Sequence, residues 1–409
     1  MNLRFARYID RWLGWFICFA LWAVQHALGR LPSRAATTPP GDEPIARPRR
    51  VLGIKFYGLG NIAMILPTVA SVRGEGEVEV DFLTLPGNRS LLEQSGLVSR
   101  VLTIDVDSFP GFLLAVFRLL GQLRQGYDAV LDFEQFMKLS SILASFTKAP
   151  ALVGFNTDGQ SRGWLYTHRV AYADTDHMAD IFMRLAVPLG RETLPAPLIL
   201  LPTEAADRDA VRSRFPADED RPLVVMHVGT GPNFDRIAIK RWSASNFARL
   251  ADYLVRERNF RVVFTGVGEE ESGLVDRVLG MMEESASATN ACDSLTVGEL
   301  TALLAHSLCV VTNDTSILHL AGLMHAPAVT FFGPTEPRLY GPRGPLDLVF
   351  YEQLFCSPCL SNYNLKISWC VNPVCMKRID VPRVIETMER EFFPRLQKAA
   401  VNTGDEVHS

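Results

Sequence analysis

Short apolar runs alternate with amphipathic segments along most of this chain of 409 residues. Runs rich in β-branched residues predict buried strands at 51–56, 78–85, 101–105, 128–133 and 151–155. Helical spacing of apolar residues predicts intervening helices at about 62–73, 112–124 and 139–146. Strands that alternate with helices form parallel sheets, because each helix carries the chain back to the start of the next strand. The first half therefore predicts a doubly wound α/β domain.

The same pattern starts again after a Pro-rich segment at residues 188–202, which we interpret as a hinge. Strands are expected at 223–229 and 261–266, with a helix at 244–257 between them. A last helix at about 381–396 is expected to pack back on the first domain. The predicted division is a first Rossmann-like domain at 51–195, a second at 196–398, and a flexible polar tail at 399–409.

Residues 310–334 are the most informative stretch of the second half. Val310 and Val311 belong to a buried strand, and a polar loop at 313–316 precedes an apolar helix that Pro327 ends. A helix that starts at the carboxyl edge of a parallel sheet offers free N–H groups to an anion, so we expect a phosphate here. The alternative is an ordinary strand–turn–helix unit with a well-capped helix.

The N-terminus differs from the rest of the chain in charge and polarity. Residues 1–50 contain eight Arg and no Lys against three acidic residues, a net of +5, so the remainder carries −9. Residues 12–24 are apolar and uncharged, but a spanning helix needs about 20 such residues. We expect residues 1–31 to be a monotopic, membrane-associated helix on the cytoplasmic side, with a single-pass span as the alternative. A Pro- and Arg-rich linker follows at 32–50.

The overall net charge of −4 argues against nucleic acid as a partner. Gly58-x-Gly60-x-x-Ala63 follows the first strand, and Asp81 comes 21 residues after Gly60 at the end of the next strand. Such a pattern can bind a dinucleotide, so an NAD-dependent oxidoreductase is one hypothesis. The glycines equally fit any tight turn that lets a ligand approach the backbone.

A second glycine turn, Gly229-Thr230-Gly231, ends the strand at 223–229, and Lys240 and Arg241 precede the next helix. Two cations beside a helix N-terminus can neutralise a diphosphate. A solvated basic loop anchored by a packed Trp242 is the alternative. One carboxylate of the run 269–271 is a candidate for accepting hydrogen bonds from sugar or ribose hydroxyls.

Four of the seven cysteines lie within twenty residues, at Cys356, Cys359, Cys370 and Cys375. Their spacing is compatible with a structural zinc site of four thiolates. Free structural cysteines are the alternative, because the second pair is not CxxC.

Taken together, four segments resemble glycosyltransferase family 9, the heptosyltransferase-like enzymes of bacterial surface polysaccharide assembly. These segments are GLGNIAMILPTVASVR (58–73), KRWSASNFARLADYL (240–254), NDTSILHLAG (313–322) and FFGPTEPRLYGP (331–342). The resemblance implies a GT-B fold, with two Rossmann-like domains facing a cleft. It also implies an inverting, metal-independent transfer from a nucleotide sugar, typically ADP-heptose, to a lipid-linked bacterial glycan at the cytoplasmic face of the inner membrane.

The resemblance also implies roles for individual residues. Lys240 is expected to contact phosphate, and Asp314 to hold the donor at the helix start and take part in catalysis. The other donor-binding residues expected are Thr230, Gly231, Arg241, Glu270, Thr315, Ser316 and His319.

Gly58, Gly60 and Asn61 are expected to form the acceptor-side loop. The family commonly has Gly-Asp where this chain has Gly60-Asn61, and that Asp is the supposed catalytic base. Asn cannot usefully accept a proton. Asn61 therefore positions the acceptor while another carboxylate or a phosphate oxygen takes the proton, or the protein binds a nucleotide sugar without transferring it.

Overall fold

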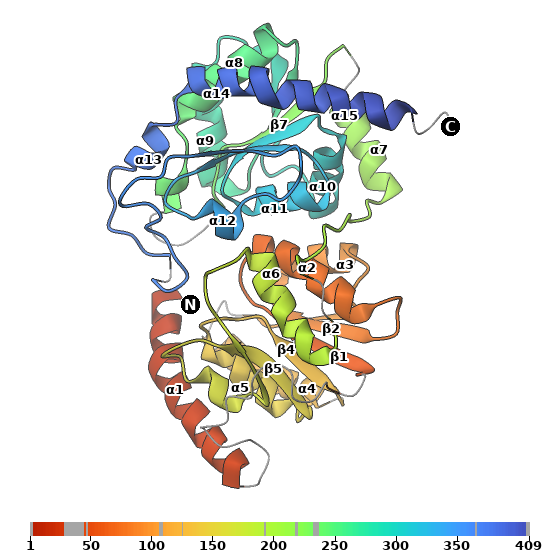
Figure 1. Cartoon of the computed structure of the whole chain (residues 1–409), viewed down its shortest axis with the longest axis vertical. Helices are drawn as coiled ribbons and strands as arrows, with labels where there is room; N and C mark the ends of the chain where they lie inside the picture. The colour runs from red at the N-terminus through yellow and green to blue at the C-terminus, as the bar shows by residue number, and fades with distance from the viewer. Residues whose placement is uncertain are drawn as a thin grey trace. The chain divides into compact units, whose positions relative to one another are not determined.

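The structure is a computed structural model that describes residues 3–27, 45, 48–105, 109–124, 126–191, 194–216, 220–231, 237–364 and 366–405. Most of the linker predicted at 32–50 lies outside the described residues. The chain forms two compact units, Met1–Ile199 and Leu200–Ser409 (Figure 1). Each unit is described by itself.

The first unit is built on a six-stranded parallel sheet of order β3-β2-β1-β4-β5-β6. Its strands are β1 (Arg50–Ile54), β2 (Glu79–Thr84), β3 (Arg100–Thr103), β4 (Ala129–Asp132), β5 (Ala151–Asn156) and β6 (His168–Ala171). Its helices are α1 (Leu3–Ala27), α2 (Leu59–Arg73), α3 (Arg89–Gln94), α4 (Phe109–Leu123), α5 (Lys138–Phe146) and α6 (Met178–Met183). The central strands β1 and β4 are mostly apolar and almost wholly buried, as expected for parallel strands covered on both faces.

The second unit repeats this architecture with the sheet order β12-β11-β10-β7-β8-β9, again parallel throughout. Its strands are β7 (Leu223–His227), β8 (Arg261–Thr265), β9 (Ala288–Asn290), β10 (Cys309–Asn313), β11 (Ala328–Phe332) and β12 (Leu348–Tyr351). Its helices are α7 (Ala205–Arg214), α8 (Ala244–Arg256), α9 (Gly268–Met281), α10 (Val297–His306), α11 (Ser316–Leu323), α12 (Pro337–Tyr340), α13 (Val374–Lys377), α14 (Val381–Thr387) and α15 (Phe393–Asp405).

The C-terminal helices belong to the second unit. Val381, Val384 and Met388 are buried in its hydrophobic core, together with the aromatic rings of Phe392 and Phe393. The sequence predicted that this segment packs on the first domain, whereas its apolar side chains are buried in the core of the second unit. Residues 399–405, assigned by the sequence to a loose tail, continue α15.

Helix α1 packs along α5 in the first unit, where the two lie side by side (Figure 1). The Asp10 carboxylate accepts the backbone N–H groups of Lys138 and Leu139 at 2.9–3.0 Å, and it thereby caps the N-terminus of α5. Cys18 of α1 is buried beside Ile142. Among the described residues, no helix combines the length and the apolar character needed to cross a bilayer.

Candidate functional site

The centre of the candidate site is an ion pair between Lys240 and Asp314, whose Nζ and Oδ2 atoms lie 2.5 Å apart. Asp314 follows β10, and Lys240 ends a short 3₁₀ turn at 237–240. The Thr335 hydroxyl donates to the same Asp314 oxygen at 2.6 Å. Burial by itself raises the pKa of Asp314, but the Lys240 ammonium and the Thr335 hydrogen bond hold that pKa below its usual value. Asp314 is therefore an ionised carboxylate in a largely buried site.

Helix α11 begins directly after this carboxylate. Thr315 is its N-cap, and the Thr315 hydroxyl accepts the Ile317 N–H at 3.1 Å. Ser316 is the first helical residue, and His319 lies half-buried one turn in. This arrangement matches the strand–polar loop–helix unit predicted from the sequence.

Asn313, which the sequence placed only in the polar loop before the helix, joins three loops of the site. Its Oδ1 accepts the Trp242 N–H at 2.9 Å, and its Nδ2 donates to the carbonyls of Val228 and Gly229 at 3.0 and 3.2 Å. Trp242 itself is buried, stacks on Phe331 and donates its ring N–H to a backbone carbonyl. The Lys240–Trp242 segment is thus fixed to the end of β10.

Arg241 lies between two other predicted donor-binding residues. Its Nε donates to the Thr230 hydroxyl at 3.2 Å, and its Nη2 lies 2.7 Å from Glu270 Oε1. Glu270 is mostly exposed, so its carboxylate remains accessible to ligand hydroxyls. The structure therefore brings Thr230, Arg241 and Glu270 into one cluster.

Glu271, the next residue, holds two loops together. Its buried carboxylate accepts the N–H groups of Gly231 at 2.8 Å and Val267 at 2.9 Å, which links the loops after β7 and β8. A Cβ atom at Gly229 would lie 1.9 Å from Glu271 Oε1. Gly229 is therefore required by the close approach of Glu271.

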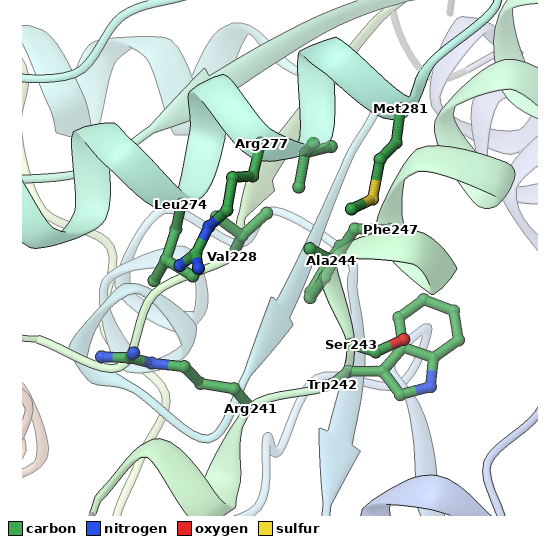
Figure 2. Close-up of a pocket in the computed structure, with 10 residues that line it drawn as sticks. Val228, Arg241, Trp242, Ser243, Ala244, Phe247, Leu274, Arg277 and Met281 are labelled. Atoms are coloured by element: carbon green, nitrogen blue, oxygen red, sulfur yellow. The ribbon is translucent and has the colours of Figure 1, made fainter.

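A cavity of about 280 Å³ adjoins Arg241 in the same unit (Figure 2). In Figure 2, Leu274 and Arg277 project from α9 toward the loop that carries Arg241. The remaining lining residues are Val228, Trp242, Ser243, Ala244, Phe247, Val278 and Met281. Its lining is mostly apolar and includes the guanidinium groups of Arg241 and Arg277.

The predicted acceptor-side loop lies in the first unit. Gly58 has φ +94°, in the region that favours glycine, and Gly60 is in the first turn of α2. The Asn61 amide donates to the Tyr57 carbonyl at 3.2 Å. Glu134 supplies a carboxylate beside this loop, because its Oε1 accepts the Phe56 N–H at 2.9 Å.

The Glu134 carboxylate already has partners on both of its oxygens. Glu134 is buried, and its second oxygen lies 3.0 Å from Lys55 Nζ. The dinucleotide interpretation meets a further difficulty, since Asp81 lies inside β2 and not at its end as predicted. Asp81 is buried and bound by Arg50, Arg100 and the Tyr127 hydroxyl, so it is not exposed to a ribose.

The four clustered cysteines occupy the loop between β12 and the end of α13. Cys356 is exposed, Cys359 and Cys370 are half-buried, and Cys375 is buried. Burial raises the pKa of Cys375, and the three other thiols add to that shift. Within the part of the chain that the structure describes, no three His, Cys, Asp or Glu side chains form a group that could hold a metal ion.

Comparison with known proteins decides the family. A sequence model of glycosyltransferase family 9 (heptosyltransferase) matches residues 116–369, which is more than half of the chain and includes both members of the buried ion pair. The chain belongs to glycosyltransferase family 9. Membership in this family favours the transferase interpretation of the glycine turns over the oxidoreductase one.

Individual members of family 9 are distant from this chain. Lipopolysaccharide heptosyltransferase 2 of Salmonella typhimurium is 27% identical over 208 residues, which are 48% of this chain and 58% of that protein. Lipooligosaccharide heptosyltransferase 2 of Haemophilus ducreyi is 24% identical over 271 residues, 63% of this chain and 76% of that protein. The alignment thus spans little more than half of the Salmonella relative.

The fold matches that of a family 9 structure over a greater length. The structure of the Escherichia coli ADP-heptose lps heptosyltransferase II superposes with a TM-score of 0.67 at 20% sequence identity, and the match covers 85% of this chain and 99% of that chain. The prediction of two parallel-sheet α/β domains of the GT-B type is confirmed.

Proposed function

We propose that this member of family 9 is an inverting glycosyltransferase that moves a heptose from ADP-heptose to a lipid-linked, lipopolysaccharide-type acceptor. The observation that carries the proposal is the buried Lys240–Asp314 pair at the start of α11. The names of the relatives supply the sugar and the acceptor class.

The proposed chemistry needs positive charge where the donor breaks. The acceptor oxygen attacks the anomeric carbon as the bond to the diphosphate cleaves, and the diphosphate leaves with the bonding electrons. Lys240 and the N–H groups at the start of α11 stabilise this leaving group, and Asp314 orients Lys240. Thr230, Gly231 and Arg241 bind the donor beside them, and the exposed Glu270 accepts hydroxyls of its ribose or sugar.

On the acceptor side, Asn61 orients the attacking hydroxyl within the loop at 58–61. An amide does not take up the released proton, so this proton passes to a phosphate oxygen or to another carboxylate. The transfer proceeds without a catalytic metal ion, and activity should therefore persist in EDTA.

A second function is favoured by one observation. The amide side chain of Asn61 cannot act as a catalytic base, and the Glu134 carboxylate near the same loop is paired with Lys55. A protein that binds the nucleotide sugar without transferring it has the same donor site.

An assay of ADP release tests the proposal and separates these two functions. Full-length protein in detergent is mixed with ADP-heptose and heptose-deficient lipopolysaccharide, with and without EDTA. The transferase releases ADP only when acceptor is present, and Asn61→Ala lowers its kcat roughly 100-fold with unchanged ADP affinity. If the protein binds ADP but releases none from ADP-heptose with any acceptor preparation, the binding function is the correct one.

We also propose that the protein works at the cytoplasmic face of the inner membrane, with α1 as a monotopic anchor. Trp12 and Phe16 of α1 are 61% and 62% exposed, although the opposite side of the helix packs on the first unit. Exposed aromatic side chains on a positively charged N-terminus fit an anionic lipid surface.

A structural zinc ion bound by Cys356, Cys359, Cys370 and Cys375 also remains a proposal. It rests on the spacing of the four cysteines in the sequence, because their side chains do not form a metal-holding group among the described residues. Metal analysis of the purified protein tests it: about one zinc per chain that is lost in Cys356→Ser supports a bound ion, and a metal-free protein argues against it.

A further inference from the structure

The Cys-rich segment, residues 356–375, begins alongside the donor site. The Ser357 hydroxyl donates to the Gly333 carbonyl, and the N–H groups of Cys359 and Leu360 donate to the Pro334 carbonyl at 2.9 and 2.7 Å. Pro334 directly precedes Thr335, whose hydroxyl binds Asp314. The segment is thus hydrogen-bonded to the residues that hold the catalytic carboxylate.

Lys366 is the basic residue of this segment whose side chain the structure fixes. Its Nζ lies 4.4 Å from the centroid of the Tyr340 ring, and the Tyr340 hydroxyl donates to Asn362 Oδ1 at 2.7 Å. The ammonium is therefore held by a cation–π contact to α12, the helix that begins two residues after Thr335.

The backbone of Lys366 is in an unusual conformation. Its φ is +57°, in the left-handed region that glycine and asparagine adopt at least cost. Its N–H donates to the Ser361 carbonyl at 2.9 Å, which closes the turn. Glycine would adopt this turn at lower cost, so Lys366→Gly removes the side chain without straining the backbone.

The charge of Lys366 acts on the central ion pair. It helps to hold the pKa of Asp314 low, after Lys240 and Thr335, and it adds to the burial that lowers the pKa of Lys240. The Lys240 ammonium contacts Asp314 directly, and the half-buried Lys366 adds a second positive charge that acts on this pair through its field. A bound polyanion relieves the repulsion between the two ammonium groups, whereas a neutral ligand does not.

We infer that Lys366 is a second diphosphate-binding residue, so that the Cys-rich segment forms part of the donor site for a nucleoside diphosphate. This inference rests on the proposed function of that site. In the reaction, Lys366 stabilises the negative charge of the departing diphosphate together with Lys240. Its partner Tyr340 keeps the ammonium beside the site before the donor binds.

The test compares the affinities of ADP, AMP and inorganic pyrophosphate for full-length protein in detergent by calorimetry. Lys366→Gly removes the ammonium and suits the left-handed backbone, Lys366→Arg retains a charge, and Lys377→Gln changes an exposed lysine of α13 as the matched control. Lys366→Gly should weaken ADP and pyrophosphate roughly tenfold and AMP much less, so the ratio of ADP to AMP affinity falls. Lys366→Arg should recover most of the loss, and Lys377→Gln should bind as wild type.

Each contrary result has a distinct meaning. If Lys366→Gly lowers ADP and AMP affinity equally, the residue acts only on the fold of the segment and the inference is overturned. If Lys366→Gly binds ADP as wild type does while Lys240→Ala does not, the inference fails and the proposed function stands. If the wild-type protein binds no ADP and no pyrophosphate, both fail together.

Discussion

Lys240 and Asp314 illustrate, at the scale of single residues, how a binding group is kept ready in a buried site. The side chains are 12% and 7% exposed, so neither charge is well solvated and each depends on the other. Breaking such a pair by removing one partner costs more than replacing both, because the remaining charge stays buried and uncompensated.

Lys240→Met should therefore lower the free energy of unfolding by about 3 kcal/mol near neutral pH, and Lys240→Met combined with Asp314→Asn should recover part of it. The pKa of Asp314 lies below the usual 3.8, so the pair contributes stability above pH 4 that is lost as pH falls through this lower pKa. The difference in the free energy of unfolding between wild type and Lys240→Met should thus become smaller in acid. Urea titrations between neutral pH and pH values below 4 measure this difference, with Lys377→Met as the control. A difference that does not depend on pH would contradict an ionised Lys240–Asp314 pair.

Several residues that the sequence identified in the second unit do lie together, but the contacts that hold them in place were not predicted. Asn313 binds carbonyls 84 and 85 residues away, and Glu271 accepts an N–H 40 residues before it. Thr335 reaches Asp314 across 21 residues. Motifs report local spacing, whereas these contacts depend on which loops meet at a sheet edge. Only a three-dimensional arrangement reveals them.

At the scale of secondary-structure elements, α1 and α5 depend on each other although more than one hundred residues separate them. The start of α5 has no cap from its own sequence, since Met137 precedes it, and Asp10 of α1 supplies the acceptor instead. Helix α1 is therefore part of the folded first unit, and removing it would expose the α5 terminus.

Asp10→Ala should lower the free energy of unfolding by about 1–2 kcal/mol, the usual cost of a lost N-cap. Asp10→Asn keeps an acceptor oxygen and should cost less. Chemical denaturation of the full-length protein measures both variants. Equal stability of Asp10→Ala and wild type would show that α5 does not depend on this cap.

The central strands were predictable because buried parallel strands have continuous apolar sequences. Most helices were predictable from the helical spacing of their apolar residues. The edge strands β6, β9 and β12 were not predicted. They are only three or four residues long and partly exposed, so their sequences carry little hydrophobic pattern. Their position depends on pairing with β5, β8 and β11, which no local pattern encodes.

At the scale of the whole molecule, the chain combines two similar parallel sheets with an N-terminal helix that has two different sides. One side of α1 packs on the first unit, and the other exposes aromatic residues. The sequence predicted a helix of this kind, but not that one side would be used by the fold.

Trp12→Gln with Phe16→Gln should reduce binding to anionic phospholipid vesicles at least tenfold and leave thermal stability unchanged. Each aromatic side chain contributes roughly 2 kcal/mol when it is buried in lipid. Co-sedimentation of the full-length protein measures binding. Val371→Gln, which changes a still more exposed apolar residue of the second unit, is the control and should bind as wild type. Unchanged binding of the double variant would place the membrane contact elsewhere.

The most direct test of the central claim, a nucleotide-sugar site at Lys240 and Asp314, is calorimetric binding of ADP, UDP, GDP and NAD to full-length protein and to Lys240→Ala. We predict that ADP binds in preference to the others and that Lys240→Ala weakens this binding at least tenfold while the protein stays folded. NAD binding that is indifferent to Lys240, or ADP binding unchanged in the variant, would contradict the account.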